Sequence, residues 1–154
     1  MALTTEKMIE ELNELIRFDY DAIGAYDEAI DSIKEAMINE PLQRFRGDHH
    51  RHVTELTAIV RRLGGKPVEK PGVKGVVRKT MTKVAGLVGI EATLKAMKSN
   101  EEVLNKTYQH HSQMDFPRDI LDVIQRNFAD EQRHLAWVEQ TLNTRAWETT
   151  GAHP

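Results

Sequence analysis

Cysteine is absent from the chain of 154 residues, and its absence excludes disulfides, thiolate metal sites and cysteine nucleophiles. Long apolar runs are absent as well, since no segment approaches the roughly 18 residues that a membrane-spanning helix needs. The first seven residues, Met-Ala-Leu-Thr-Thr-Glu-Lys, have neither the basic nor the apolar region of a signal peptide. We therefore expect a cytoplasmic protein with no membrane partner.

An excess of one charge is also missing. The 21 Lys and Arg residues and the 24 Asp and Glu residues give a formal net charge of -3 at pH 7, so nothing draws the whole molecule to nucleic acid. The length is sufficient for one domain with a substantial core. We expect that domain over residues 1–145, followed by a disordered tail over residues 146–154.

Apolar residues recur at steps of three and four in four long segments, which is the spacing of one helix face. The predicted helices cover about residues 5–39, 41–63, 87–113 and 117–145. Pro41 suits the first turn of the second helix, where its missing N–H costs little. Gly64 and Gly65 end that helix, and Phe116 with Pro117 marks a tight turn into the fourth.

Glycine and proline are concentrated between the second and third helices, over residues 64–75. Residues 76–85 are predicted to form a short extra helix in the same connection. So long a link allows the third helix to run parallel to the second, whereas short turns near residues 40 and 115 make each helix pair antiparallel. The predicted fold class is all-α, an antiparallel four-helix bundle with a long crossover between its second and third helices.

Polar side chains interrupt all four apolar stripes near their middles. They are Asp19 in the first helix, His49 and His52 in the second, Glu101 in the third, and Glu131 and His134 in the fourth. The two residues of each pair are three positions apart, so both lie on one helix face and can bind one ion together. Carboxylate and imidazole ligands suit iron, manganese or zinc. Buried carboxylates without a cation would be costly, which favours a metal site.

The two halves of the sequence repeat one another. Residues 48–52 read DHHRH and residues 130–134 read DEQRH, which share the pattern D-x-x-R-H. The repeat matches Asp19 with Glu101, Tyr26 with Tyr108, Asp48 with Asp130, His49 with Glu131, and His52 with His134. A pseudo-two-fold axis between two helical hairpins would bring all of these positions to one level of the bundle.

Asp48 and Asp130 immediately precede the two ligand pairs. A metal-bound His usually donates its second ring N–H to a carboxylate or a carbonyl. We therefore expect each Asp to support the ligating His of the opposite helix. Tyr26 and Tyr108 lie on the same stripes as the carboxylates, and they either hydrogen-bond a ligand or fill the core.

Other polar residues nearby have simpler interpretations. His111 is expected to be a core histidine with satisfied hydrogen bonds, and His50 and His110 are expected to face solvent. Arg51 and Arg133 are expected to form surface ion pairs. For the cluster as a whole, the alternative to a metal site is a buried polar network without metal.

These motifs resemble the ferritin-like superfamily of di-metal carboxylate bundles, which includes ferritin, bacterioferritin and rubrerythrin. The segment DEQRHLAWVE resembles the D-E-x-x-H segment that supplies a bridging Glu, a terminal His and an outer Asp. The segment DYDAIGAY resembles the bacterioferritin pattern E-x-x-A-I-x-x-Y, with Asp19 in place of the terminal Glu, and Glu101 falls where the third helix supplies its Glu. The resemblance spans about residues 5–145 and is greatest to small bacterial members near the rubrerythrins.

Two residues depart from the family pattern. His49 stands where the family has a second bridging Glu, and a neutral His does not bridge two ions as a carboxylate does. Asp19 is one methylene shorter than Glu, so its metal would have to lie closer to the first helix. Three carboxylates also balance only three of the four charges of two divalent ions. The expected site therefore holds two ions asymmetrically, one ion, or an ion other than iron.

The resemblance implies a di-iron centre that oxidises Fe(II) or consumes O₂ or peroxide. Its expected cofactors are two metal ions, with iron favoured over manganese and zinc and a single ion as an alternative. Asp19, Glu101 and Glu131 would be anionic ligands, with Glu131 bridging. His52 and His134 would be terminal ligands, as would His49 in place of a bridge, while the outer residues would be Asp48, Asp130, Tyr26 and Tyr108.

Two other classes of function are compatible with the sequence. One is a non-catalytic or stress-related bundle that holds a single zinc or iron ion. The other is a purely structural bundle that binds a partner through its surface. We also expect a homodimer, because the apolar face of the fourth helix is widened by Leu121, Phe128, Leu135 and Leu142.

Overall fold

The structure is a computed structural model that describes residues 2–70 and 81–148. Its helices are α1 (Thr5–Ser32), α2 (Ala36–Arg62), α3 (Ile90–Ser112), α4 (Arg118–Thr144) and the short 3₁₀ helix η1 (Ala146–Glu148). No strand occurs in the described residues. The all-α, four-helix prediction is therefore confirmed, and no helix in the described part of the chain is long and apolar enough to cross a membrane.

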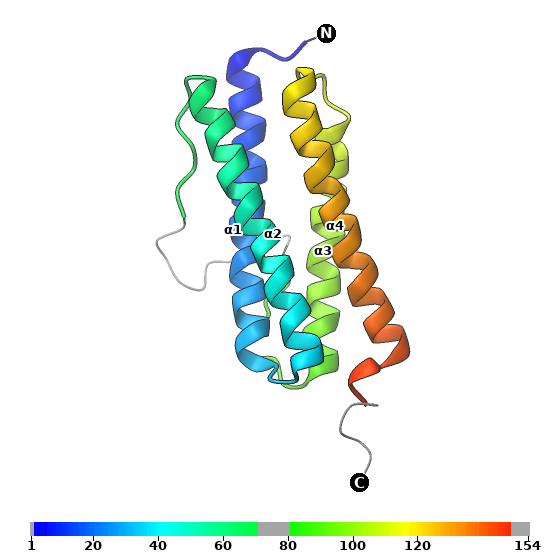
Figure 1. Ribbon diagram of the computed structural model, residues 1–154. Helices are drawn as coiled ribbons and strands as arrows, with labels where there is room; N and C mark the ends of the chain where they lie inside the picture. Colours follow the sequence, from blue (N-terminus) through cyan, green and yellow to red (C-terminus); the bar gives the residue numbers. More distant parts are fainter. Residues whose placement is uncertain (1, 71–80, 149–154) are drawn as a thin grey trace.

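The four helices form two antiparallel hairpins that lie side by side, α1 with α2 and α3 with α4 (Figure 1). Because α2 and α3 run in the same direction, residues 63–89 connect opposite ends of the bundle. Residues 71–80 of this connection lie outside the described part of the chain. The predicted short helix over residues 76–85 falls partly there, and the remaining residues, 81–85, are not helical.

The break between α1 and α2 differs from the prediction, because it lies at residues 33–35 instead of at Pro41. The side-chain amide of Asn39 donates to the backbone oxygens of Ile30 and Ile33, at 2.9 and 2.8 Å, and so satisfies carbonyls at the end of α1. Pro41 consequently lies inside α2, in its second turn. A contact between neighbouring helices, rather than the proline, determines where the chain turns.

Two other helix starts follow local signals. Thr4 caps α1, because its side-chain oxygen accepts a hydrogen bond from the backbone N–H of Lys7 at 3.1 Å. The start of α3 is Ile90 rather than residue 87, because Gly89 has a φ of +94°, which is incompatible with a right-handed helix.

Two apolar residues within the predicted helix ranges 5–39 and 87–113 do not lie in the core. Met37 and Leu87 are each 36% exposed, since Met37 lies in the first turn of α2 and Leu87 precedes α3. The predicted disordered tail also differs at its start, because Ala146–Glu148 forms η1 and Trp147 packs against the apolar core. Residues 149–154 lie outside the described part of the chain.

Two apolar clusters fill the bundle on either side of its middle. One joins the starts of α1 and α4 to the ends of α2 and α3, and it includes Leu12, Ile16, Leu56 and Ile124. The other joins the end of α1 to the starts of α2 and α3, and it includes Ile33, Leu42, Leu94 and Met97. Each fully buried Leu or Ile stabilises the fold by about 1.5–3 kcal/mol. The two clusters therefore hold the helices together above and below the polar layer between them.

Asn39→Ala removes both hydrogen bonds from the side chain of Asn39 to the end of α1. We expect the free energy of unfolding, measured by urea denaturation, to fall by about 1–3 kcal/mol because two carbonyls lose their partner. Asn143→Ala, at an exposed position near the end of α4, is the matched control and should change it by at most about 0.5 kcal/mol. Equal losses for the two variants would contradict the role of Asn39.

Candidate metal centre

The six polar side chains of the apolar stripes meet in the middle of the bundle. All six are 0% exposed: Asp19 from α1, His49 and His52 from α2, Glu101 from α3, and Glu131 and His134 from α4. Helical phase brings them together, because each lies on the stripe that its helix turns towards the other three helices. Within the described residues they form two overlapping groups able to hold a metal ion, and both groups contain His49 and Glu131.

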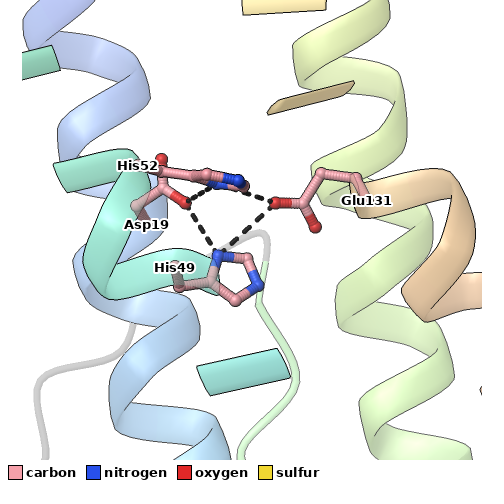
Figure 2. Close-up of side chains that lie close together, drawn as sticks. All are labelled: Asp19, His49, His52 and Glu131. Carbon is pink, nitrogen blue, oxygen red and sulfur yellow. Dashed lines mark hydrogen bonds and ion pairs between the residues drawn. The ribbon is translucent and has the colours of Figure 1, made fainter. Parts of the chain in front are cut away.

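The first group consists of Asp19, His49, His52 and Glu131, whose side chains point towards one another in Figure 2. Asp19 Oδ1 lies 2.7 Å from His49 Nδ1 and 3.0 Å from His52 Nδ1. Glu131 Oε1 faces the same two nitrogens, at 3.4 and 3.5 Å. Two oxygens and two nitrogens thus alternate around a small ring that joins α1, α2 and α4.

The second group consists of His49, Glu101, Glu131 and His134. Glu101 Oε1 lies 3.7 Å from both His49 Nε2 and His134 Nδ1. Glu131 Oε2 lies 3.5 Å from His134 Nδ1. These separations are too long for good hydrogen bonds, so the ligand atoms of the second group face one another without binding directly.

Two carboxylates at the edge of the cluster hold the outer nitrogens of His52 and His134. Nε2 of His52 donates to Asp130 Oδ2 at 2.8 Å, and Nε2 of His134 donates to Asp48 Oδ2 at 2.8 Å. Each Asp therefore reaches the His of the opposite helix, as the sequence repeat predicts. This hydrogen bond fixes the ring orientation and turns Nδ1 of each His towards the interior of the cluster.

Arg51 and Arg133 connect the two outer carboxylates. Arg51 donates to Asp130 across the helix pair and to Asp48 of its own helix, the latter at 3.2 Å. Arg133 donates to Asp48 and to Asp130, each at 2.9 Å. The sequence predicts surface ion pairs for both arginines but not that these pairs join α2 to α4, because partners so distant in sequence cannot be read from helical spacing.

The two tyrosines contact carboxylates of the opposite hairpin. The hydroxyl of Tyr26 donates to Glu101 Oε1 at 2.6 Å, and the hydroxyl of Tyr108 donates to Asp19 Oδ2 at 2.5 Å. Both open interpretations therefore apply, because each tyrosine hydrogen-bonds a carboxylate of the cluster and is also buried in an apolar cluster. Asn105, which the sequence pattern does not single out, donates to the backbone oxygens of Glu101 and Glu131 at 2.8 and 2.9 Å. Its only sequence signal is its position one turn after Glu101.

The protonation of the cluster follows from burial and mutual contact. Burial raises the pKa of Glu131 to about 7, with Glu101 adding to the rise and His49 opposing it. Burial also lowers the pKa of His134, but its contacts with Asp48 and Glu101 outweigh that effect and raise the pKa to about 10. Protons on the imidazoles thus balance the carboxylates, and a cation that entered the cluster would displace them.

Several buried ligand atoms have no hydrogen-bond partner among the described residues. They are His49 Nε2, Glu101 Oε2, Glu131 Oε1 and Oε2, and His134 Nδ1. Buried polar atoms are nearly always paired in folded proteins, and an unpaired one costs about 1–3 kcal/mol. The convergence of these atoms in the middle of the bundle fits a cation site, since carboxylate and imidazole lone pairs are ligands of iron, manganese and zinc.

The other histidines in the described part of the chain lie away from the cluster. His111 is buried, its Nδ1 donates to the backbone oxygen of Thr107 at 2.8 Å, and its Nε2 lies 2.8 Å from Glu11 Oε2. It is therefore a core histidine with a hydrogen bond on Nδ1 and an ion-pair partner, Glu11, facing Nε2. His50 and His110 are exposed.

Several solved structures share this architecture. A ferritin like, diiron-carboxylate protein from Bacillus anthracis has a TM-score of 0.73 at 19% identity, over 92% of this chain and 99% of that chain. The Desulfovibrio desulfuricans bacterioferritin has a TM-score of 0.73 at 18% identity, over 90% and 80%. A dodecameric thioferritin from Bacteroides fragilis has a TM-score of 0.76 at 17% identity, over 97% and 93%. At such low identity these likenesses establish the ferritin-like fold alone.

No curated protein matches the chain by sequence. The model of one family, described as a domain of unknown function (DUF2383), matches residues 7–113. That segment contains Asp19, His49, His52 and Glu101, and it ends before α4. The fold of the chain is the ferritin-like four-helix bundle. The family match covers more than half of this chain, so the chain belongs to the DUF2383 family.

Proposed function

We propose that the protein binds two divalent metal ions, with iron favoured, among the six buried side chains in the middle of the bundle. The observation that supports this most strongly is the convergence of buried ligand atoms that lack a hydrogen-bond partner within the described ranges. Each of the two groups offers two carboxylates and two imidazoles. Such a mixture of oxygen and nitrogen donors is typical of iron, manganese and zinc sites.

Each ligand's proposed role follows from its membership of the two groups. Asp19 and His52 belong to the first group only, so they would bind one ion. Glu101 and His134 belong to the second group only, so they would bind the other ion. Glu131 belongs to both, and its two oxygens face different groups, which supports its role as a bridging carboxylate.

The proposed activity is the oxidation of Fe(II) or the consumption of O₂ or peroxide. Iron supplies the electrons for such chemistry when it is bound, by passing between Fe(II) and Fe(III). Two of the similar structures are a diiron-carboxylate protein and a bacterioferritin with a diiron site in different catalytic states, which supports a di-iron centre here. The chain itself holds the ligands between two apolar clusters, so the ions would bind among side chains that the fold already brings together.

A single zinc or iron ion without redox turnover is the second candidate. The first group supports it, because Asp19, His49, His52 and Glu131 already surround one point with neighbouring ligand atoms 2.7–3.5 Å apart. Tetrahedral zinc sites use four ligands of these types. This ion would stabilise the bundle without a reaction.

We also propose a homodimer in the cytoplasm. The support for the dimer is the stripe of Leu121, Phe128, Leu135 and Leu142 on α4, all of which are partly exposed. A mass of two chains in light scattering is the expected result, and a single-chain mass at micromolar concentration would contradict it. The cytoplasmic location rests on the absence of cysteine from the sequence.

Protein purified from iron-replete cells should contain two metal ions per chain by elemental mass spectrometry. Reloaded with Fe(II) under nitrogen, it should oxidise that iron faster than buffer does when O₂ is admitted. Glu101→Ala should lose bound metal, whereas Glu102→Ala, at the exposed neighbouring position, should not. One bound ion without faster oxidation would favour the second candidate, and protein that takes up no metal would exclude both.

Asp48→Asn and Asp130→Asn should each weaken Zn(II) binding by about 10–100-fold, because His134 and His52 lose the carboxylates that orient them. The affinity is measured by competition with a chromophoric chelator. Asp122→Asn, at an exposed position of α4, is the matched control and should leave the affinity unchanged. An unchanged affinity in Asp48→Asn and Asp130→Asn would show that the outer carboxylates do not support the ligands.

A further inference from the structure

His49 differs from the other two histidines of the cluster in where its ring nitrogens point. Nδ1 of His49 lies in the first group, 2.7 Å from Asp19 Oδ1 and 3.4 Å from Glu131 Oε1. Nε2 lies in the second group, 3.7 Å from Glu101 Oε1, and has no hydrogen-bond partner in the part of the chain that the structure describes. Both nitrogens of this one ring therefore face candidate ligands, on opposite sides.

His52 and His134 are held differently. Each of them directs Nε2 away from the cluster to a carboxylate, Asp130 or Asp48, and keeps only Nδ1 for the interior. A ligating His usually shows this pattern, with one nitrogen for the metal and the other for an outer acceptor. His49 has no such outer acceptor among the described residues, so its second nitrogen is left for a second ion.

We propose that His49 bridges the two metal ions, with Nδ1 bound to the ion of the first group and Nε2 bound to the ion of the second group. The inference rests on the proposed two-ion function of the same site. Both ring nitrogens have a free lone pair only when the imidazole has lost its N–H proton. That proton passes to water as the second ion binds, and the ring becomes an imidazolate anion.

The charge of the site supports this binding mode. Two divalent ions carry four positive charges, and Asp19, Glu101 and Glu131 return three negative charges. An imidazolate at His49 supplies the fourth and makes the buried site neutral. A neutral His49 would leave one uncompensated charge in a layer whose six side chains have no exposed surface, which is unfavourable. His49 would thus replace the bridging carboxylate in both position and charge.

The rival arrangement is a His49 that binds one ion through a single ring nitrogen, as the terminal ligand that the sequence predicts. A crystal structure of the wild-type protein loaded with Zn(II), with anomalous data at the zinc edge, separates the two. The expected result is two zinc peaks, each about 2.0–2.1 Å from a different nitrogen of His49. Two peaks with one His49 nitrogen unbound, or a single peak, would overturn the bridge but keep metal binding. Absence of zinc from the cluster would overturn the proposed function itself.

A titration with Co(II) tests the same bridge in solution. The wild type should bind two ions. His52→Ala should weaken the binding of one of these ions, and His134→Ala should weaken the binding of the other. His49→Ala should weaken both, each more than about tenfold, because it removes a ligand from both groups. If His49→Ala weakens the binding of only one ion, as the two matched variants are expected to do, the bridge is excluded. Circular dichroism melting of all three variants establishes that they are folded, and if His49→Ala is not, the zinc structure of the wild type decides.

Discussion

The structure depends on one constraint, which is the burial of three carboxylates in the middle of a four-helix bundle. Asp19, Glu101 and Glu131 have no exposed surface. Apolar clusters on both sides of them hold the helices in place, so the carboxylates cannot reach water without separating the bundle. Uncompensated buried charge is one of the most unfavourable features of a folded protein. The histidines, tyrosines and outer carboxylates are arranged around this charge, and a cation would complete its compensation.

Helical periodicity was sufficient to predict most of the site. Asp19, Glu101 and the pairs on α2 and α4 occupy positions that apolar residues would otherwise fill, so their burial follows from phase alone. The D-x-x-R-H repeat also predicted that Asp48 and Asp130 would meet the histidines of the opposite helices, because a pseudo-two-fold axis exchanges the two hairpins. Whether these residues bind metal is a matter of chemistry that the pattern predicts but does not test.

Contacts between distant residues could not be predicted in the same way. The α1–α2 break depends on the side chain of Asn39 in α2 reaching carbonyls at the end of α1, and this contact overrides the local signal of Pro41. The cross-helix bonds of Arg51 and Arg133 and the two bonds of Asn105 are also tertiary. The position of the His49 ring between both ligand groups, with one nitrogen facing each, follows only from the assembly of all four helices. Spacing alone does not orient a side chain.

The dependence of the buried carboxylates on a cation is measured most directly by the free energy of unfolding of the wild type and of Glu101→Gln/Glu131→Gln, with and without Zn(II). Without metal, the amides should lower stability, because the imidazoles of His49 and His134 lose the charge partner that Glu101 gives them. With Zn(II) at about 100 times its dissociation constant, the wild type should gain about 2.7 kcal/mol, and the double variant should gain far less. A wild type that gains no stability from Zn(II), Mn(II) or Fe(II) would contradict a metal centre in this bundle.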